Sequence, residues 1–157
     1  MRPVEGFVVR PVAYVRCSRT TPVDDGWDLE VSEIELTADF GPEALVGLDE
    51  VSHLDVITLF HLVDPDAEFP QQRRPRGDPS LPEVGIFAQR NKDRPNRLGL
   101  TTCRLLEVHG TVCKVEGLDA VDGTPILDLK PHFAAFDPRG PRREPTWAAP
   151  LLEHYWR

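Results

Sequence analysis

Several common protein classes are excluded by what this 157-residue sequence has little of. Its apolar runs are far shorter than the roughly 20 consecutive residues that a transmembrane helix needs. A secretory signal peptide is not indicated either, because the N-terminal stretch MRPVEGFVVRPVAYV has no long apolar segment followed by a small-residue cleavage site. These absences predict a soluble, cytoplasmic protein that does not associate with membranes.

Cysteine and histidine are also scarce. Cys17, Cys103 and Cys113 lie far apart and form no C-x-x-C pair, so we interpret them as buried thiols in strands. A metal site or a catalytic thiol is the less favoured alternative. The histidines show no spacing typical of a zinc site (His53, His61, His109, His132 and His154). We therefore predict no metal ion.

The secondary-structure pattern is mainly β. A Rossmann domain is not indicated, because the chain lacks both a G-x-G-x-x-G motif and a regular alternation of strands and helices. Stretches rich in β-branched and aromatic residues predict strands at 7–15, 29–36, 54–63, 84–89, 100–108, 111–116 and 126–129. Many short strands with little helix favour an antiparallel barrel or a sandwich.

The segments between these strands also carry signals. Pro42 starts a short helix, and His109-Gly110 forms a tight hairpin turn because glycine tolerates positive φ. Residues 65–82, with five prolines and one glycine, form a long surface loop. We expect one domain over residues 1–140, followed by a C-terminal tail over residues 141–157 that holds a short helix interrupted at Pro150.

Charge is segregated along the chain. The net charge of −8 argues against general affinity for nucleic acids. Residues 24–55 contain eleven Asp or Glu and no Lys or Arg, whereas residues 71–97 contain seven Lys or Arg and three acids. Such a basic segment can form a local phosphate-binding face. The alternative is a solvated loop whose arginines pair with the acidic segment.

Two loop-rich blocks stand out as a candidate ligand site. The first, GIFAQRNKDRPNRLGLT (85–101), gathers four basic side chains around Asp93, with Pro95-Asn96 at a turn. The second, GLDAVDGTPILDLKP (117–131), places three aspartates around Gly123-Thr124-Pro125. Each block ends in an apolar run that is typical of a strand. Charged loops that lead into strands in this way indicate a ligand-binding site rather than a part of the hydrophobic core.

These blocks, preceded by SEIEL (32–36) and EALVGLDEVSHLDVITLFH (43–61), occur in an order that resembles the TsaA/TrmO-like family. The resemblance covers roughly residues 5–135. It implies a single antiparallel β-barrel that uses S-adenosylmethionine (SAM) without a Rossmann fold. It also implies tRNA as partner, a homodimer, and N6-methylation of threonylcarbamoyladenosine next to the anticodon.

The resemblance implies roles for particular residues as well. Cofactor contacts are expected from His61, Leu62, Arg90, Leu100, Asp119, Ala120, Val121 and Asp122. Substrate contacts are expected from Lys92, Arg94, Asn96 and Arg97. A carboxylate can accept hydrogen bonds from the amino or ribose groups of SAM, and an arginine can form a charge-assisted bond with its carboxylate. No catalytic base is assigned.

Alternatives remain for these residues and for the reaction. Arg90, Arg94 and Asn96 can instead form a structural turn with salt bridges, and His61 can be a core histidine. The family has the motif R-S-P-x-R-P-N-P-I-G at residues 90–99. In this chain Asn91 replaces the serine, and Arg97 replaces the proline that follows the asparagine. The same barrel can methylate a small molecule or another nucleophile, or bind SAM without catalysis.

Overall fold

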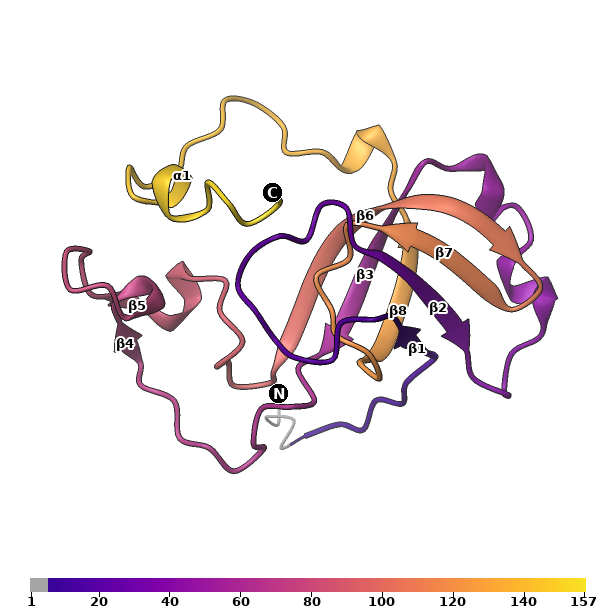
Figure 1. The fold of residues 1–157 in the computed structure, drawn as a ribbon, viewed down its shortest axis with the longest axis horizontal. Helices are drawn as coiled ribbons and strands as arrows, with labels where there is room; N and C mark the ends of the chain where they lie inside the picture. The colour runs from indigo at the N-terminus through magenta and orange to yellow at the C-terminus, as the bar shows by residue number, and fades with distance from the viewer. Residues whose placement is uncertain (1–5) are drawn as a thin grey trace, which may run out of the picture.

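The computed structural model describes residues 6–157, and its central feature is a closed antiparallel barrel (Figure 1). Around the barrel the strands follow the order β1-β2-β7-β6-β3-β8, and β8 pairs again with β1. The barrel strands are β1 (Ala13–Arg16), β2 (Val31–Leu36), β3 (His53–Leu59), β6 (Leu98–His109), β7 (Val112–Glu116) and β8 (Pro125–Pro131). The prediction of a mainly β, non-Rossmann barrel is confirmed.

A smaller sheet and short helices complete the described structure. Strands β4 (Gln72–Arg73) and β5 (Val84–Gly85) form a separate two-stranded sheet. The 3₁₀ helices are η1 (Pro42–Leu45), η2 (Leu48–Glu50), η3 (Pro75–Gly77), η4 (Ile86–Ala88) and η5 (Ala134–Phe136), and the one α-helix in residues 6–157 is α1 (Ala148–Leu151). None of the helices in this range is long and apolar enough to cross a membrane.

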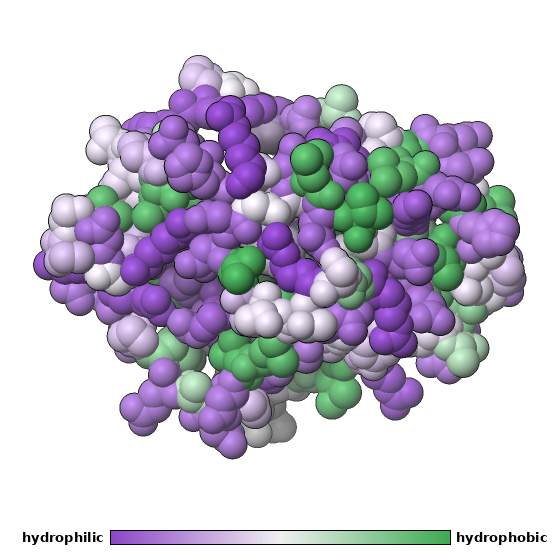
Figure 2. Space-filling model, in the orientation of Figure 1, coloured by the Kyte–Doolittle hydropathy of each residue, from purple (hydrophilic) through white to green (hydrophobic). Residues whose placement is uncertain are grey.

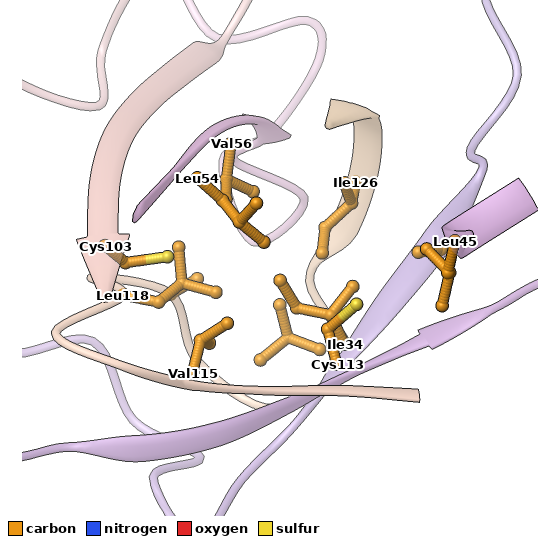
Figure 3. Packing of buried hydrophobic residues seen from close by; sticks show 12 residues of the cluster. Ile34, Leu45, Leu54, Val56, Cys103, Cys113, Val115, Leu118 and Ile126 are labelled. Carbon is orange, nitrogen blue, oxygen red and sulfur yellow. The ribbon is translucent and has the colours of Figure 1, made fainter. Parts of the chain in front are cut away.

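The core fills the interior of the barrel. Alternate residues of β3 point inward, so Leu54 and Val56 are fully buried, as an amphipathic strand requires. Figure 3 shows them facing Leu118 and Val115, with Ile126 of β8 beside them. Burying each such side chain stabilises the fold by about 1.5–3 kcal/mol.

Several strand boundaries differ from the predictions. The first predicted strand shrinks to β1, because Pro11 cannot donate a backbone hydrogen bond, and Phe7 and Val8 before it are 81% and 89% exposed. The second starts at Val31 rather than at residue 29, and β3 ends at Leu59, where a turn replaces the rest of the predicted strand. The predicted strand 84–89 consists of β5 and the 3₁₀ turn η4.

Other expectations agree with the structure. Gly110 has a φ of +60° in the β6–β7 hairpin, as the turn required. Cys103 and Cys113 are buried and Cys17 is half-buried. Burial raises the thiol pKa of Cys103 to about 12 and that of Cys113 to about 11, so neither is a nucleophile at neutral pH. The short helix expected in the tail is α1, but Pro150 lies inside it, so the predicted interruption at Pro150 is wrong: a proline in the first turn of a helix has no intrahelical hydrogen bond to lose.

The smaller sheet and the C-terminal helix lie at one side of the barrel (Figure 1). In Figure 1 the small sheet β4–β5 and helix α1 lie on the same side of the barrel, and the C-terminus returns toward the barrel. On the face seen in Figure 2, hydrophobic side chains form separate patches among hydrophilic ones. The loops that carry most of the residues predicted for the site extend from this side.

Candidate cofactor-binding site

The loop between β7 and β8, residues 118–124, is anchored to the segment that follows β1. The backbone N–H of Asp122 donates to the carbonyl of Arg19 at 2.7 Å, and that of Gly123 donates to Val15 at 2.8 Å. Gly123 has a φ of +77°, a conformation that side-chain-bearing residues rarely adopt. Two backbone hydrogen bonds therefore join the loop to β1 and the segment after it, and Gly123 supplies the positive φ of its turn.

Asp119 is the acidic centre of this loop. Its carboxylate oxygens accept hydrogen bonds from the Thr101 hydroxyl on β6 and from the Tyr155 hydroxyl of the C-terminal tail. Burial raises the pKa of Asp119, while these two hydrogen bonds act to lower it. A carboxylate offers about four acceptor positions, so two donors leave capacity for a ligand.

Arg90 supplies the opposite charge at the same place. Its Nη2 donates to the carbonyl of Leu100 at 2.9 Å, which fixes the guanidinium over β6. Its positive charge acts to lower the pKa of both Asp119 and Tyr155. Among residues 6–157 no other hydrogen bond of Arg90 is found, and the side chain is exposed to solvent. Arg90 and Asp119 thus bind adjacent residues of β6, Leu100 and Thr101, and a guanidinium and a carboxylate in this arrangement fit a ligand with carboxylate and ammonium groups.

The other residues predicted to contact the cofactor surround this pair to different degrees. His61 lies beside the loop, since its Nε2 is 4.0 Å from the position that a Cβ would occupy at Gly123. Ala120 and Val121 are buried, so they can offer only backbone groups to a ligand. Leu62 is 58% exposed on the turn after β3. The structure thus brings His61 close to the loop of Asp119. The side chains of Leu62 and Leu100, in contrast, are exposed, and no contact among the described residues places them at this loop.

Asp122 has a structural partner. Its Oδ1 accepts a hydrogen bond from the backbone N–H of Cys17 at 3.1 Å. This contact joins the β7–β8 loop to the end of β1, so part of the carboxylate's capacity is used within the protein. The sequence pattern did not indicate this role.

The residues predicted to contact substrate lie on the loop between η4 and β6. Arg94 Nη1 donates to the carbonyl of Gln89 at 2.6 Å, and Arg97 Nη1 donates to that of Val63 at 3.0 Å. Through these hydrogen bonds both arginines help to hold the loop. Arg97 also has a φ of +51°. Lys92 pairs with Asp93 at 3.0 Å but is largely exposed. Asn96 is exposed and makes no hydrogen bond to the described residues through its side chain.

The basic segment partly neutralises itself. Arg73 pairs with Asp93 at 2.7 Å within the segment, and Arg76 pairs with Asp25 of the acidic segment at 2.8 Å. The alternative of arginines that pair with the acidic segment therefore holds for Arg76, whereas Arg73 pairs with an acid of its own segment. Exposed pairs of this kind contribute little stability and can exchange for phosphate contacts.

Sequence reasoning missed two residues of the site. Thr101 and Tyr155 both donate to Asp119, yet one reads as an ordinary strand residue and the other lies in the tail. Neither has a local signal in the sequence, because their proximity arises from the barrel closure and the return of the tail. Within residues 6–157, no cluster of three or more potential metal ligands is present.

Comparison with known proteins identifies the fold. The family model of the tRNA-methyltransferase O N-terminal domain matches residues 15–138. A crystal structure of TrmO from Pseudomonas aeruginosa superposes with a TM-score of 0.72 at 28% identity, covering 90% of this chain and 62% of that one.

Curated relatives agree with the family model. A probable S-adenosyl-L-methionine-binding protein of Methanothermobacter thermautotrophicus is 35% identical over 136 residues, 84% of this chain and 94% of the relative. The tRNA (adenine(37)-N6)-methyltransferase of Mus musculus is 36% identical over 94 residues, 60% of this chain. The match spans about a fifth of that longer protein, 21% of its length. This chain belongs to the tRNA-methyltransferase O N-terminal domain family.

Proposed function

We propose that this protein is a SAM-dependent methyltransferase that methylates N6 of threonylcarbamoyladenosine next to the anticodon of tRNA. The observation that carries the proposal is that Arg90 and Asp119 bind adjacent residues of β6, Leu100 and Thr101, at the end of a barrel that the family model covers. Names of relatives support it, since one is a probable SAM-binding protein and another a tRNA methyltransferase.

The residues of the site fit the chemistry of SAM. Asp119 has acceptor capacity for the amino or ribose groups, and Arg90 has donors for the carboxylate of the amino-acid part. Because Gly123 has no side chain, the backbone there can approach a bound ligand closely. When bound, SAM supplies an activated methyl group, and the protein's task is then to position the acceptor.

The tRNA would lie over the exposed basic loop. Lys92 and Asn96 project from the loop that leads from Arg90 into β6, so a phosphate bound there would lie near the proposed cofactor site. Because the net charge is −8, affinity must come from this local patch and not from the overall field.

A second candidate is methylation of a small molecule by the same site. It is favoured by the relative from M. thermautotrophicus, which aligns over 94% of its length and is described only as SAM-binding. Both candidates require SAM at Asp119 and Arg90, and they differ in whether the basic loop contacts RNA. A non-catalytic SAM-binding module is the remaining alternative.

Two further proposals accompany this function. We infer a cytoplasmic location, since tRNA is modified there, and a homodimer, as the family resemblance implies. Exposed apolar side chains on β6 outside the predicted cofactor contacts, Leu98 and Leu106, offer a surface for a second copy. Light scattering after size exclusion tests the dimer, and a monomer at all concentrations would contradict it.

Methyl transfer distinguishes the candidates. The purified protein is incubated with isotope-labelled SAM and tRNA that carries threonylcarbamoyladenosine, and the nucleosides are analysed by mass spectrometry. Label on that nucleoside supports the proposed function. SAM binding without label on tRNA, but with label in a metabolite extract, favours the second candidate. SAM binding without label on either leaves the non-catalytic module.

A further inference from the structure

The C-terminal tail, residues 141–157, returns to the barrel and pairs with the loop before β2. The backbone N–H groups of Gly26, Trp27 and Asp28 donate to the carbonyls of residues 154, 155 and 156 at 3.1, 3.1 and 2.8 Å. Three consecutive hydrogen bonds between segments this far apart in sequence fix the last residues of the chain in space. Figure 1 shows this return of the tail toward the loop between β1 and β2.

The loop that receives the tail is itself well anchored. Trp27 is only 4% exposed, and the Arg19 guanidinium lies over its ring at 4.0 Å from the centroid. Arg19 also donates to the carbonyl of Gly26 at 3.0 Å, and its backbone carbonyl accepts from Asp122 at 2.7 Å. The same arginine therefore connects the tail's docking segment with the β7–β8 loop.

This docking places one side chain of the tail into the candidate site. The Tyr155 hydroxyl donates a hydrogen bond to Asp119 Oδ2, and the Thr101 hydroxyl on β6 donates one to Asp119 Oδ1. The Tyr155 ring is half-buried and packs edge-on against Trp156, with 5.0 Å between ring centroids. Asp119 is thus held by one donor on the barrel and one on the tail.

We propose that Tyr155 is a positioning residue of the cofactor site, which orients the Asp119 carboxylate for a cationic ligand. The inference rests on the proposed function, because it assumes that Asp119 contacts SAM. A carboxylate with one donor on each oxygen cannot rotate freely, and its remaining acceptor positions then face a fixed direction. The tail becomes part of the site and not an appendage of the barrel.

The charged and titratable groups around Asp119 support a role beyond packing. The charge of Arg90, from the loop before β6, acts to lower the pKa of Asp119, and the charge of Asp119 acts to raise the pKa of the Cys103 thiol on β6. The charge of Arg76 acts on the Tyr155 hydroxyl, whose pKa it acts to lower. Burial raises the pKa of Tyr155, so its hydroxyl keeps its proton and stays a donor at physiological pH. Removing this donor removes one of the contacts that keep Asp119 ionised in a buried position.

Tyr155→Phe tests the proposal, because it deletes the hydroxyl and keeps the ring. We expect SAM affinity, measured by calorimetry, to fall by about three- to tenfold, the effect of one hydrogen bond. Loss of the hydroxyl also removes a contact that lowers the pKa of Asp119, so the carboxylate is protonated at a higher pH in the variant. We therefore expect the loss of SAM affinity to be larger at about pH 5 than at about pH 8, and the midpoint of the curve of affinity against pH to move upward. A purely structural role would weaken binding equally at each pH.

Tyr14→Phe is the matched control. Tyr14 is the other of the two tyrosines, lies on the outer face of β1, and makes no side-chain hydrogen bond to the described residues. We expect its affinity and pH midpoint to equal those of the wild type. If Tyr155→Phe behaves like Tyr14→Phe, or loses affinity without a shift of the midpoint, the positioning role is overturned.

The outcome also separates this inference from the proposed function. If the wild type binds no SAM, the proposed function itself fails. If Tyr155→Phe does not fold, carbon-13 NMR spectra of the wild type with and without SAM test the role of Tyr155 instead. Addition of SAM must then move both the Asp119 carboxyl signal and the Tyr155 ring signals. Movement of Asp119 alone would overturn the role of Tyr155.

Discussion

The Oδ1 atom of Asp122 accepts a hydrogen bond from the backbone N–H of Cys17 at 3.1 Å, which links positions 105 residues apart in the chain. The same two segments are joined by a backbone bond from Asp122 to Arg19. Asp122 therefore stabilises the loop that carries Asp119, whatever else it contacts. Any mutation of Asp122 must be interpreted with both roles in view.

Two substitutions at this position separate the roles. Asp122→Ala leaves the Cys17 N–H without its acceptor, so we expect the free energy of unfolding to fall by about 1–3 kcal/mol. Asp122→Asn retains an acceptor oxygen and removes the charge, so we expect nearly wild-type stability. Thermal denaturation measures both. If the asparagine variant is as unstable as the alanine variant, the hydrogen bond is not the source of stability.

SAM titration of the same pair tests the predicted cofactor contact. If the charge of Asp122 contributes to binding, Asp122→Asn has weaker affinity at unchanged stability. Unchanged affinity in Asp122→Asn would restrict this residue to its structural role.

Charge reversal in the basic loop addresses the RNA face. Because Lys92 is the most exposed of the cations predicted there, we expect Lys92→Glu to weaken tRNA binding and to reduce the slope of log affinity against log salt by about 1. Lys114→Glu, on the exposed face of β7, is the matched control and should leave both unchanged. Equal effects of the two variants would remove the loop from the RNA face.

Charge reversal at Arg94 or Arg97 should also weaken tRNA binding, and it should in addition destabilise the loop. Both side chains hold the loop through backbone carbonyls, so their loss also loosens it. We therefore expect a drop in melting temperature for Arg94→Glu that Lys92→Glu does not show. Unchanged tRNA binding at low salt in the arginine variants would contradict a role in the RNA face.

His132 gives a prediction about pH and stability. Its Nδ1 contacts Asp55 at 3.0 Å and its Nε2 contacts Asp137 at 2.9 Å. Hydrogen bonds to Asp55 and then to Asp137 raise the pKa of His132, so its contribution to stability is complete below about pH 6.5. The contribution is lost as pH rises through the raised pKa.

His132→Gln should therefore flatten the decline of stability between about pH 6 and pH 8. Urea denaturation at several pH values measures this slope. His109→Gln, at the exposed end of β6, serves as control and should keep the wild-type slope. If both variants retain the wild-type slope, the contacts of His132 are not linked to folding in this range.

Strand patterns and ordered motifs were sufficient to predict the barrel and the loops of the site. The largely apolar run 54–63, with its β-branched residues, predicted a buried central strand, and β3 buries Leu54 and Val56. Arg90 and Asp119 were identified because they stand in recognisable blocks between turn residues. Where local signals are strong, the sequence is therefore a good guide to the structure.

The errors arose where contacts between distant segments decide the outcome. Phe7 and Val8 have high β propensity but find no strand partner, so propensity alone misled the prediction. Tyr155 has no neighbouring motif, and its place beside Asp119 depends on three backbone bonds made by the tail. The structural role of Asp122 likewise depends on the closure of β1 onto β8.

The most direct test of the account is a calorimetric titration with SAM of the wild type and of Asp119→Asn. Burial raises the pKa of Asp119, so the wild-type affinity should increase with pH as the carboxylate ionises. The variant should bind about ten- to a hundredfold more weakly, as expected for the loss of a charge-assisted hydrogen bond, and should lose this pH dependence. Equal affinity and equal pH dependence of the two proteins would contradict the assignment of this end of the barrel as the cofactor site.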